Sequence, residues 1–238
     1  MLWNNYFLNR NVTPGFYKEV VLSPFLKSVL TAKDSKVLDL GCGFGQDLRA
    51  LAANGFNNIY GVDVSDEAVN YCQSEKLPVH KIKSLELFFQ ENSLGKFDVV
   101  LMSHVLEHLS KDRIISTLMG IRDNLLNKNG VLIIRVPNAQ ANTGCYWAYE
   151  DFTHATLFTT GSLGFVLKAA GFEKIDFVDL DGFEYTRVLF KYPRKILLWL
   201  YKLNVNFWNL VTASSFHRQS PISFAYEIKV IASNSSKE

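Results

Sequence analysis

Three glycines at alternate positions, Gly41, Gly43 and Gly45, lie between two acidic residues, Asp39 and Asp63. Glycine has no Cβ and tolerates positive φ angles, so the chain can turn tightly here and lie directly against a ligand. An apolar run ahead of the glycines predicts a buried strand, and a second predicted strand ends on Asp63. A carboxylate at that place could accept both hydroxyls of a ribose. The pattern predicts a βαβ unit that binds a nucleoside.

The spacing of the glycines favours one class of nucleoside. A dinucleotide fingerprint would need a third glycine at position 46, where the chain has Gln46. Asp39 would repel a pyrophosphate but suits a cationic ligand. The pattern Asp-x-Gly-x-Gly-x-Gly, with a second acid after the next strand, resembles the class I S-adenosylmethionine-dependent methyltransferases. The alternative is a glycine-rich turn in another Rossmann-like fold.

The resemblance extends over about residues 36–180. The segment 97–108 resembles the fourth-strand motif of small-molecule methyltransferases, in which the loop after the strand lines the methionine and acceptor side of the pocket. The turn at residues 84–86 stands where members of the family bind the adenine amine. The group that would bind it here is the Ser84 side chain, the Ser84 backbone or Glu86. The resemblance implies S-adenosylmethionine as methyl donor and S-adenosylhomocysteine as product. It also implies a set of cofactor-binding residues: Asp39, Gly41, Cys42, Gly43, Gly45, Asp63, Val64, Ser84, Leu85, Ser103 and His104.

An acid and a histidine, Asp151 and His154, follow the fifth predicted strand. Their segment resembles methyltransferases of surface-glycan gene clusters and relatives that act on small hydroxylated acceptors. A hydroxyl acceptor must lose its proton, and a histidine with an ordinary pKa of ~6.5 suits that task near neutral pH. We therefore predict His154 as the base, Asp151 as its orienting or acceptor-binding partner, and His104 as the second candidate base. The alternative is a purely structural role for these side chains.

The sequence His104-Val-Leu-Glu107-His108 also has the spacing of an inverted zinc-protease motif. It directly follows a strand of a nucleotide-binding sheet, and no third ligand is apparent. Some methyltransferases that resemble the ubiquinone-biosynthesis enzymes have an acid in place of His104 and bind a divalent cation. Since hard cations prefer oxygen ligands, we expect no bound metal and a pocket-lining role for this segment.

These motifs predict an O-methyltransferase that acts on a small hydroxylated acceptor. The first hypothesis for this acceptor is a sugar or phosphorylated saccharide precursor of a surface glycan. Exposed rings could stack on sugar faces, and aromatic residues are dense beside Asp151: Tyr146, Trp147, Tyr149, Phe152 and Phe158. A quinone or phenolic acceptor, with or without a metal, is the second hypothesis. A catalytically silent protein that binds S-adenosylmethionine is the third.

Strands that alternate with helices predict the fold that positions these residues. We expect a Rossmann-like, doubly wound α/β sheet of seven strands, mostly parallel with an antiparallel last strand at the edge, and helices on both faces. The expected helices span residues 15–31, 46–54, 65–71 and 113–126, with another helix that ends at Gly171. The expected strands lie at residues 37–40, 59–63, 79–82, 97–102 and 131–136, directly after Phe172, and at 222–231.

Length and composition fit one domain over residues 1–238. We expect a helical N-terminal cap (1–35), a cofactor-binding core (36–180), a helical insertion or lid (187–218) and a terminal strand (221–232). A net charge of +2 does not indicate a nucleic-acid partner. The three scattered cysteines and the lack of a signal-peptide pattern predict a cytoplasmic protein, a monomer or a homodimer.

The helical insertion combines bulky apolar residues with Arg194, Lys195 and Lys202. Three interpretations compete: a lid over the acceptor pocket, a dimer surface, or a contact of residues 190–212 with a membrane surface. The sequence favours the lid or the dimer surface.

Overall fold

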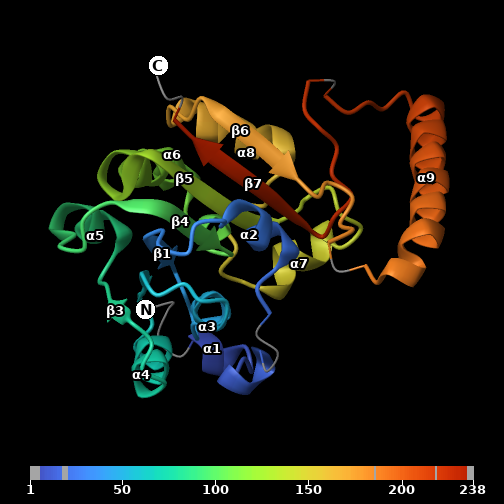
Figure 1. The fold of residues 1–238 in the computed structure, drawn as a ribbon. Helices are drawn as coiled ribbons and strands as arrows, with labels where there is room; N and C mark the ends of the chain where they lie inside the picture. Colours follow the sequence, from blue (N-terminus) through green and yellow to red (C-terminus); the bar gives the residue numbers. More distant parts are fainter. Residues whose placement is uncertain (1–5, 18–20, 185, 218, 235–238) are drawn as a thin grey trace.

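The computed structural model describes residues 6–17, 21–184, 186–217 and 219–234, and its centre is a seven-stranded sheet between helices (Figure 1). The strands are β1 (Val37–Leu40), β2 (Ile59–Asp63), β3 (Val79–Lys81), β4 (Phe97–Ser103), β5 (Leu126–Pro137), β6 (Lys174–Val178) and β7 (Glu227–Ser233). The helices are α1 (Tyr6–Asn9), α2 (Pro24–Val29), α3 (Gln46–Ala53), α4 (Asp66–Ser74), α5 (Leu85–Glu91), α6 (Lys111–Gly120), α7 (Gly144–Glu150), α8 (Thr160–Ala169) and α9 (Val188–Val211). Short 3₁₀ turns cover Pro14–Tyr17 and Leu106–His108, and a π-helical turn covers Ile121–Leu125.

The strand order is β3-β2-β1-β4-β5-β7-β6, and β7 pairs antiparallel with both of its neighbours. The predicted doubly wound sheet with an antiparallel last strand is therefore confirmed. The predicted place of that strand at the edge is wrong, because β7 lies between β5 and β6. Most of β7 is buried, whereas β6 is partly exposed, as an edge strand is.

The two faces of the sheet carry separate hydrophobic layers. Helices α5, α6 and α8 pack on one face, where Leu38 and Leu40 of β1 point. Helices α2, α3 and α4 pack on the other face, where Val37 points. Side chains alternate along a strand, so Asp39 points to the same face as Val37, toward α3. This places an acidic side chain inside an otherwise apolar layer.

Several predicted boundaries differ in the structure. The helix expected over residues 15–31 is a 3₁₀ turn and the six-residue helix α2, with residues 18–20 outside the described part; Ser23 caps α2 and Pro24 begins it. The helix expected to reach residue 126 ends as the π-helical turn, and β5 begins at Leu126, opposite Phe97, before a register shift. The terminal strand begins at Glu227, five residues later than expected.

The carboxyl ends of the parallel strands bring the predicted functional residues to one edge of the sheet. The glycine loop follows β1, Val64 follows β2, Ser84 follows β3, and His104 follows β4. The segment that contains Asp151 and His154 comes after β5 and α7. The topology thus collects residues more than one hundred positions apart in the chain.

Candidate active site

The glycine loop between β1 and α3 has the conformation that its residues allow. Gly41, Gly43 and Gly45 have φ angles of 77°, 49° and 73°, in the region that disfavours other residues. A Cβ on Gly41 would lie 2.4 Å from Val105 Cγ2, so this turn also needs the missing side chain. The predicted tight turn is confirmed, and the close approach of this backbone to a ligand stays a prediction.

Asp63 at the end of β2 fixes the position of this loop. Its carboxylate accepts hydrogen bonds from the backbone N–H of Gly43 (2.8 Å) and of Ser65 (2.7 Å). Burial raises the pKa of Asp63, although these backbone hydrogen bonds oppose the shift. Each carboxylate oxygen has a second lone pair. The geometry therefore allows a ribose hydroxyl to join these contacts, and the ribose-binding role of Asp63 stays a prediction.

Asp39 is 3% exposed and belongs to a group of acids around one arginine. Burial and the neighbouring Asp47 raise the pKa of Asp39 well above its ordinary value, although Arg135 opposes the shift. Arg135 forms an ion pair with Asp47 and donates a hydrogen bond from Nε to Ser103 Oγ at 3.0 Å. Asp47 and Asp63 both raise the pKa of Asp39, while Lys81 is the cation near Asp63. A buried acid among other acids fits S-adenosylmethionine, whose sulfonium and ammonium groups are cationic.

The predicted adenine-reading turn is the beginning of helix α5. Ser84 caps this helix, and its hydroxyl accepts a hydrogen bond from the Leu87 N–H at 3.3 Å. Leu85 is buried, and Glu86 forms an ion pair with Arg113 of α6. Both polar side chains of this turn thus have partners within the protein, and the choice of adenine contact among Ser84, its backbone and Glu86 stays a prediction.

His104 has a left-handed backbone (φ 54°), which is uncommon for a residue other than glycine. Its Nδ1 lies 3.3 Å from Glu107 Oε1, and its Nε2 lies 3.4 Å from Glu227 Oε2. Burial alone would lower the pKa of His104, but the two carboxylates outweigh it and raise the pKa to about 9. His104 is therefore protonated at neutral pH, which argues against its predicted role as the second candidate base.

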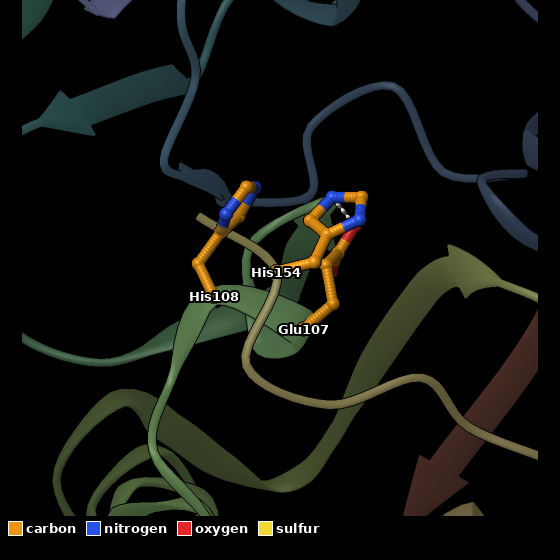
Figure 2. Close-up of side chains that lie close together, drawn as sticks. All are labelled: Glu107, His108 and His154. Carbon is orange, nitrogen blue, oxygen red and sulfur yellow. Dashed lines mark ion pairs between the residues drawn. The ribbon is translucent and has the colours of Figure 1, made fainter. Parts of the chain in front are cut away.

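His154 lies beside Glu107 and Asp151, as Figure 2 shows for the first pair. Its Nδ1 is 2.6 Å from the carbonyl oxygen of Trp147, which can only accept, so Nδ1 is the donor and the lone pair of the neutral ring is on Nε2. Nε2 is 3.7 Å from Asp151 Oδ2 and 4.0 Å from Glu107 Oε1. The loop is held there because the Glu107 carbonyl accepts from the N–H groups of residues 155 and 156.

Asp151 connects this loop to the N-terminal helix α1. Its carboxylate accepts from the Tyr6 hydroxyl at 2.6 Å and from Thr153, and it pairs with Arg10 at 3.0 Å. Burial would raise the pKa of Asp151, but the hydrogen bonds from Thr153 and Tyr6 lower it to about 2. Asp151 is thus an ionised group beside Nε2 of His154, and its orienting or acceptor-binding role stays a prediction.

Glu107 is fully buried, and neither carboxylate oxygen has a hydrogen-bond donor among the described residues. One ligand atom from each of Glu107, His108 and His154 lies within 4.8 Å of the others (Figure 2). Thr153 donates its hydroxyl proton to Asp151, so His108 Nδ1 donates to Thr153 and the lone pair of neutral His108 is on Nε2. Burial lowers the pKa of His108, which favours that neutral form. One carboxylate and two imidazoles suit a transition-metal ion better than a hard cation.

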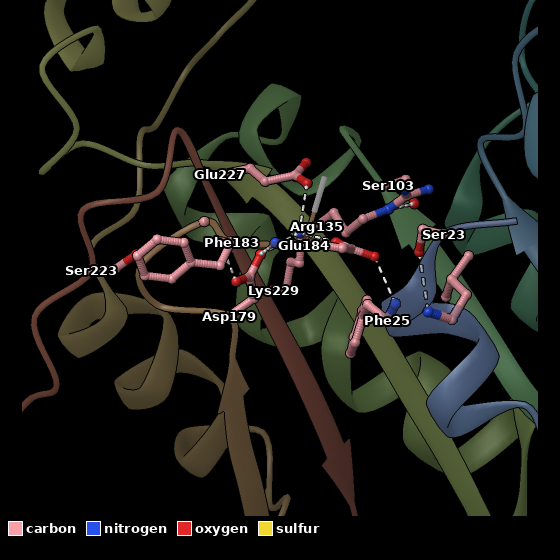
Figure 3. A network of polar contacts seen from close by, with 12 residues as sticks. Ser23, Phe25, Ser103, Arg135, Asp179, Phe183, Glu184, Ser223, Glu227 and Lys229 are labelled. Carbon is pink, nitrogen blue, oxygen red and sulfur yellow. Dashed lines mark hydrogen bonds and ion pairs between the residues drawn. The ribbon is translucent and has the colours of Figure 1, made fainter. Parts of the chain in front are cut away.

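A buried ionic network continues from this cluster to strand β7 (Figure 3). Lys229, 4% exposed, forms ion pairs with Asp179 at 3.1 Å, with Glu184, and with Glu227 at 3.5 Å. Glu184 also accepts from the backbone N–H of Phe25 at the start of α2 (2.6 Å). Burial would raise the pKa of Glu227, but His104 outweighs it and lowers the pKa to about 2. The network therefore holds the carboxylate that faces His104.

Several contributors to the site were not among the predicted residues: Tyr6, Arg10, Asp47, Arg135, Thr153 and Glu227. Glu227 and Lys229 occupy alternate positions in an apolar predicted strand, and that spacing is a signal of a buried ion pair. Tyr6 and Arg10 precede the sheet by some thirty residues, and nothing in their local sequence indicates a contact with Asp151.

Comparison with known proteins agrees with this geometry. A methyltransferase-domain family model matches residues 16–176. The methyltransferase ausD of Aspergillus calidoustus is 29% identical over 126 residues, which cover 47% of this chain and 45% of that protein. An uncharacterised Methanocaldococcus jannaschii protein is 37% identical over 117 residues, 48% of this chain and 47% of that protein. The chain thus spans less than half the length of these curated relatives.

Solved structures share the fold at low sequence identity. A SAM-dependent methyltransferase from Archaeoglobus fulgidus superposes with a TM-score of 0.64 and 20% identity, covering 95% of this chain and 97% of that one. The magnesium protoporphyrin IX methyltransferase from Synechocystis, solved with bound SAM, gives a TM-score of 0.52 and 17% identity over 93% of this chain and 79% of that one. From the family match, the sheet and the glycine loop with its acids, we conclude that the chain belongs to the class I S-adenosylmethionine-dependent methyltransferases.

Proposed function

We propose that this protein transfers the methyl group of S-adenosylmethionine to a hydroxyl oxygen of a small acceptor, with His154 as the base. The observation that carries the proposal is the fixed ring of His154. The Trp147 carbonyl engages Nδ1, so the lone pair of Nε2 faces the site beside ionised Asp151.

The reaction follows from this geometry. The acceptor hydroxyl gives its proton to His154 Nε2, its oxygen forms a bond to the methyl carbon, and the bond between that carbon and sulfur breaks, leaving neutral S-adenosylhomocysteine. Asp151 stabilises the imidazolium that forms. Such a base contributes on the order of 10²–10⁴-fold to the rate, and alignment of the acceptor oxygen with the methyl group supplies much of the rest.

The acceptor class rests on the surface beside the site. Tyr146, Tyr149 and Phe152 are 53%, 83% and 94% exposed, on α7 and just after it. Flat rings with this exposure suit stacking against the apolar face of a sugar. A saccharide or phosphorylated saccharide is therefore the first proposed acceptor, and a phenol or quinone the second.

The test combines cofactor binding with product detection. Calorimetry should show binding of S-adenosylmethionine and S-adenosylhomocysteine, and mass spectrometry of a panel of nucleotide sugars and catechols should show a +CH₂ product. His154→Gln should lower kcat by about 10²-fold or more with unchanged cofactor affinity. Exposed His217→Gln is the matched control. Cofactor binding without turnover of any acceptor, with His154→Gln lacking a cellular phenotype, would favour the silent-protein hypothesis.

A second candidate function, metal-assisted methyl transfer to a phenolic acceptor, is favoured by the buried carboxylate of Glu107. A cation held by Glu107, His108 and His154 would add to the positive charge of His104, which lies 3.3 Å from Glu107 Oε1, and would lower the pKa of an acceptor hydroxyl. Elemental analysis of the purified wild type and of the Glu107→Gln variant distinguishes metal-assisted transfer from transfer with His154 as the base. Stoichiometric metal in the wild type and its loss in the variant, with activity lost in EDTA, would establish metal assistance. Full activity in metal-free protein would exclude it.

A further inference from the structure

Helix α9 is the feature of this molecule that the methyltransferase site does not use. It is 24 residues long and stands beside the sheet rather than on it, at the right of Figure 1. The structure describes all 24 residues, and none of them is buried. In the described part of the chain no helix meets the length and apolarity that crossing a membrane requires.

The inner face of α9 contacts the rest of the protein through polar groups and through Leu197, Leu198 and Tyr201, which line a cleft with Phe224. Lys202 forms an ion pair with Asp181 at 2.8 Å, and Arg194 donates to the backbone carbonyl of Gly182. The Tyr201 hydroxyl donates to Asn142 Oδ1 at 2.7 Å, in the loop that follows β5. These contacts orient the helix, so the opposite face is turned away from the protein body.

The outer face of α9 is apolar along its whole length. Its central stripe repeats at spacings of three and four residues, and every member is exposed by 47% or more: Tyr192, Ile196, Trp199, Leu203, Phe207 and Leu210. Leu200 and Val211 on one side and Trp208 beyond them widen the stripe, whereas Leu197 lines the cleft that faces the protein body. At 100° per residue the apolar arc from Trp199 to Trp208 spans about 180° of the helix, wider than the stripe of about 100° that packs on one neighbour.

The width of this arc decides between the possible partners. A second copy of α9 would cover only the central stripe and would leave Trp208 and Val211 in water. A planar apolar boundary can accept the whole arc, and tryptophan and tyrosine are the side chains that favour the interface between lipid and water.

Charge indicates which boundary. Residues 185–226 contain six lysines and arginines and not one aspartate or glutamate, whereas the rest of the chain has more acids than lysines and arginines. Lys191 and Lys195 are exposed on the same helix, with the Lys195 ammonium 6.0 Å from the Phe183 ring centroid, and long lysine side chains can reach lipid headgroups from such positions. Cations beside an apolar helical face are typical of helices that lie on anionic bilayers.

We propose that α9 is an interfacial helix that binds the surface of an anionic phospholipid bilayer, with its outer face in the boundary between headgroups and acyl chains. This differs from the lid and dimer interpretations that the sequence favours. Because Tyr201 contacts the loop after β5, the bound protein would hold the acceptor end of the sheet near the membrane.

Cosedimentation of the full chain with vesicles tests the proposal. Vesicles of phosphatidylcholine with 30 mol% phosphatidylglycerol should bind the wild type, and pure phosphatidylcholine should bind it at least about tenfold more weakly. The double variant Ile196→Glu with Leu203→Glu should lose binding to both. Phe165→Glu, on an α8 position that is 67% exposed, is the matched control and should bind as the wild type does.

Two further measurements make the result decisive. Calorimetry with S-adenosylmethionine should give the same affinity for all variants, which shows that each is folded and separates this proposal from the proposed function. Sedimentation velocity reports the oligomeric state. Absence of wild-type binding to the anionic vesicles would overturn the proposal, and a wild-type dimer that the double variant converts to monomer would then assign α9 to self-association.

Discussion

At the scale of single residues, the site contains buried acidic groups that lie close to one another. Asp39 points into an apolar layer, and its carboxyl is raised in pKa by burial and by Asp47. A buried acid with a raised pKa lowers the stability of the ligand-free protein. The same acid can stabilise a bound cationic ligand. Natural proteins accept such local costs where function requires them.

Asp39→Asn should therefore stabilise the protein and weaken cofactor binding. The pKa of Asp39 is raised in the folded protein. The destabilisation that Asp39 causes is therefore absent below its ordinary pKa of ~4 and grows as the pH rises above that value. We expect the free energy of unfolding to rise by about 1–2 kcal/mol at pH 7 and not at pH 3.5. The dissociation constant for S-adenosylmethionine should rise about 10–100-fold.

Exposed Asp34→Asn is the matched control for this prediction, and chemical denaturation and calorimetry are the measurements. An Asp39→Asn protein that binds the cofactor as tightly as the wild type would show that Asp39 does not serve the cationic ligand.

At the scale of elements, the short helix α1 is held by contacts to parts of the chain far from it. Four residues cannot form a stable helix alone. Tyr6 and Arg10 bind Asp151, and the Phe7 ring packs on Phe44 at 4.5 Å between centroids. A Cβ on Gly43 would lie 3.5 Å from the Phe7 ring. Helix α1 thus covers the glycine loop.

Tyr6→Phe should loosen this cover. The variant loses one hydrogen bond to an ionised carboxylate, which contributes about 1.5 kcal/mol. We expect the dissociation constant for S-adenosylmethionine to rise about 3–10-fold, measured by calorimetry, with a small change in melting temperature. Tyr192→Phe on exposed α9 should change neither quantity. Unchanged affinity in Tyr6→Phe would mean that α1 does not cover the bound cofactor.

At the scale of the whole molecule, a chain of alternating charges connects the sheet to the site. Lys229 faces Glu227, Glu227 faces His104, and His104 faces Glu107 (Figure 3 shows the first pair). The folded-state pKa of His104 is raised to about 9, so its stabilisation is present below 6.5 and is lost as pH rises through 9. The pKa of Glu227 is lowered to about 2, so its stabilisation is present above 4.5 and is lost as pH falls through 2.

The free energy of unfolding should consequently fall between pH 6.5 and pH 9.5. The side chain of His104 is 49% exposed, which screens its ion pairs and limits the loss to about 1 kcal/mol. His104→Asn keeps a residue that tolerates the left-handed backbone but cannot titrate, and should make the stability flat over this range. Urea denaturation at a series of pH values measures both; an equal decline in His104→Asn would assign the pH dependence to other groups.

The sequence by itself determined the cofactor half of this protein. The glycines at 41, 43 and 45, the acids at 39 and 63 and the alternation of strands with helices are local patterns, set by backbone sterics and by side-chain periodicity. These patterns were sufficient to predict the sheet, the conformation of the glycine loop and membership of the S-adenosylmethionine-dependent methyltransferases.

Only the tertiary structure decided the acceptor half. That β7 lies inside the sheet, that Asp151 binds Tyr6, and that Glu107 is buried without a donor between two histidines among the described residues all depend on contacts between distant segments. Burial and the sign of the nearest charge decide whether His104 and Asp39 are protonated. The amino-acid sequence reveals neither the burial of these side chains nor their charged neighbours. The same holds for α9: its sequence is amphipathic, but only the contacts of Tyr201 with Asn142 and of Lys202 with Asp181 show which face of the helix is turned toward the protein.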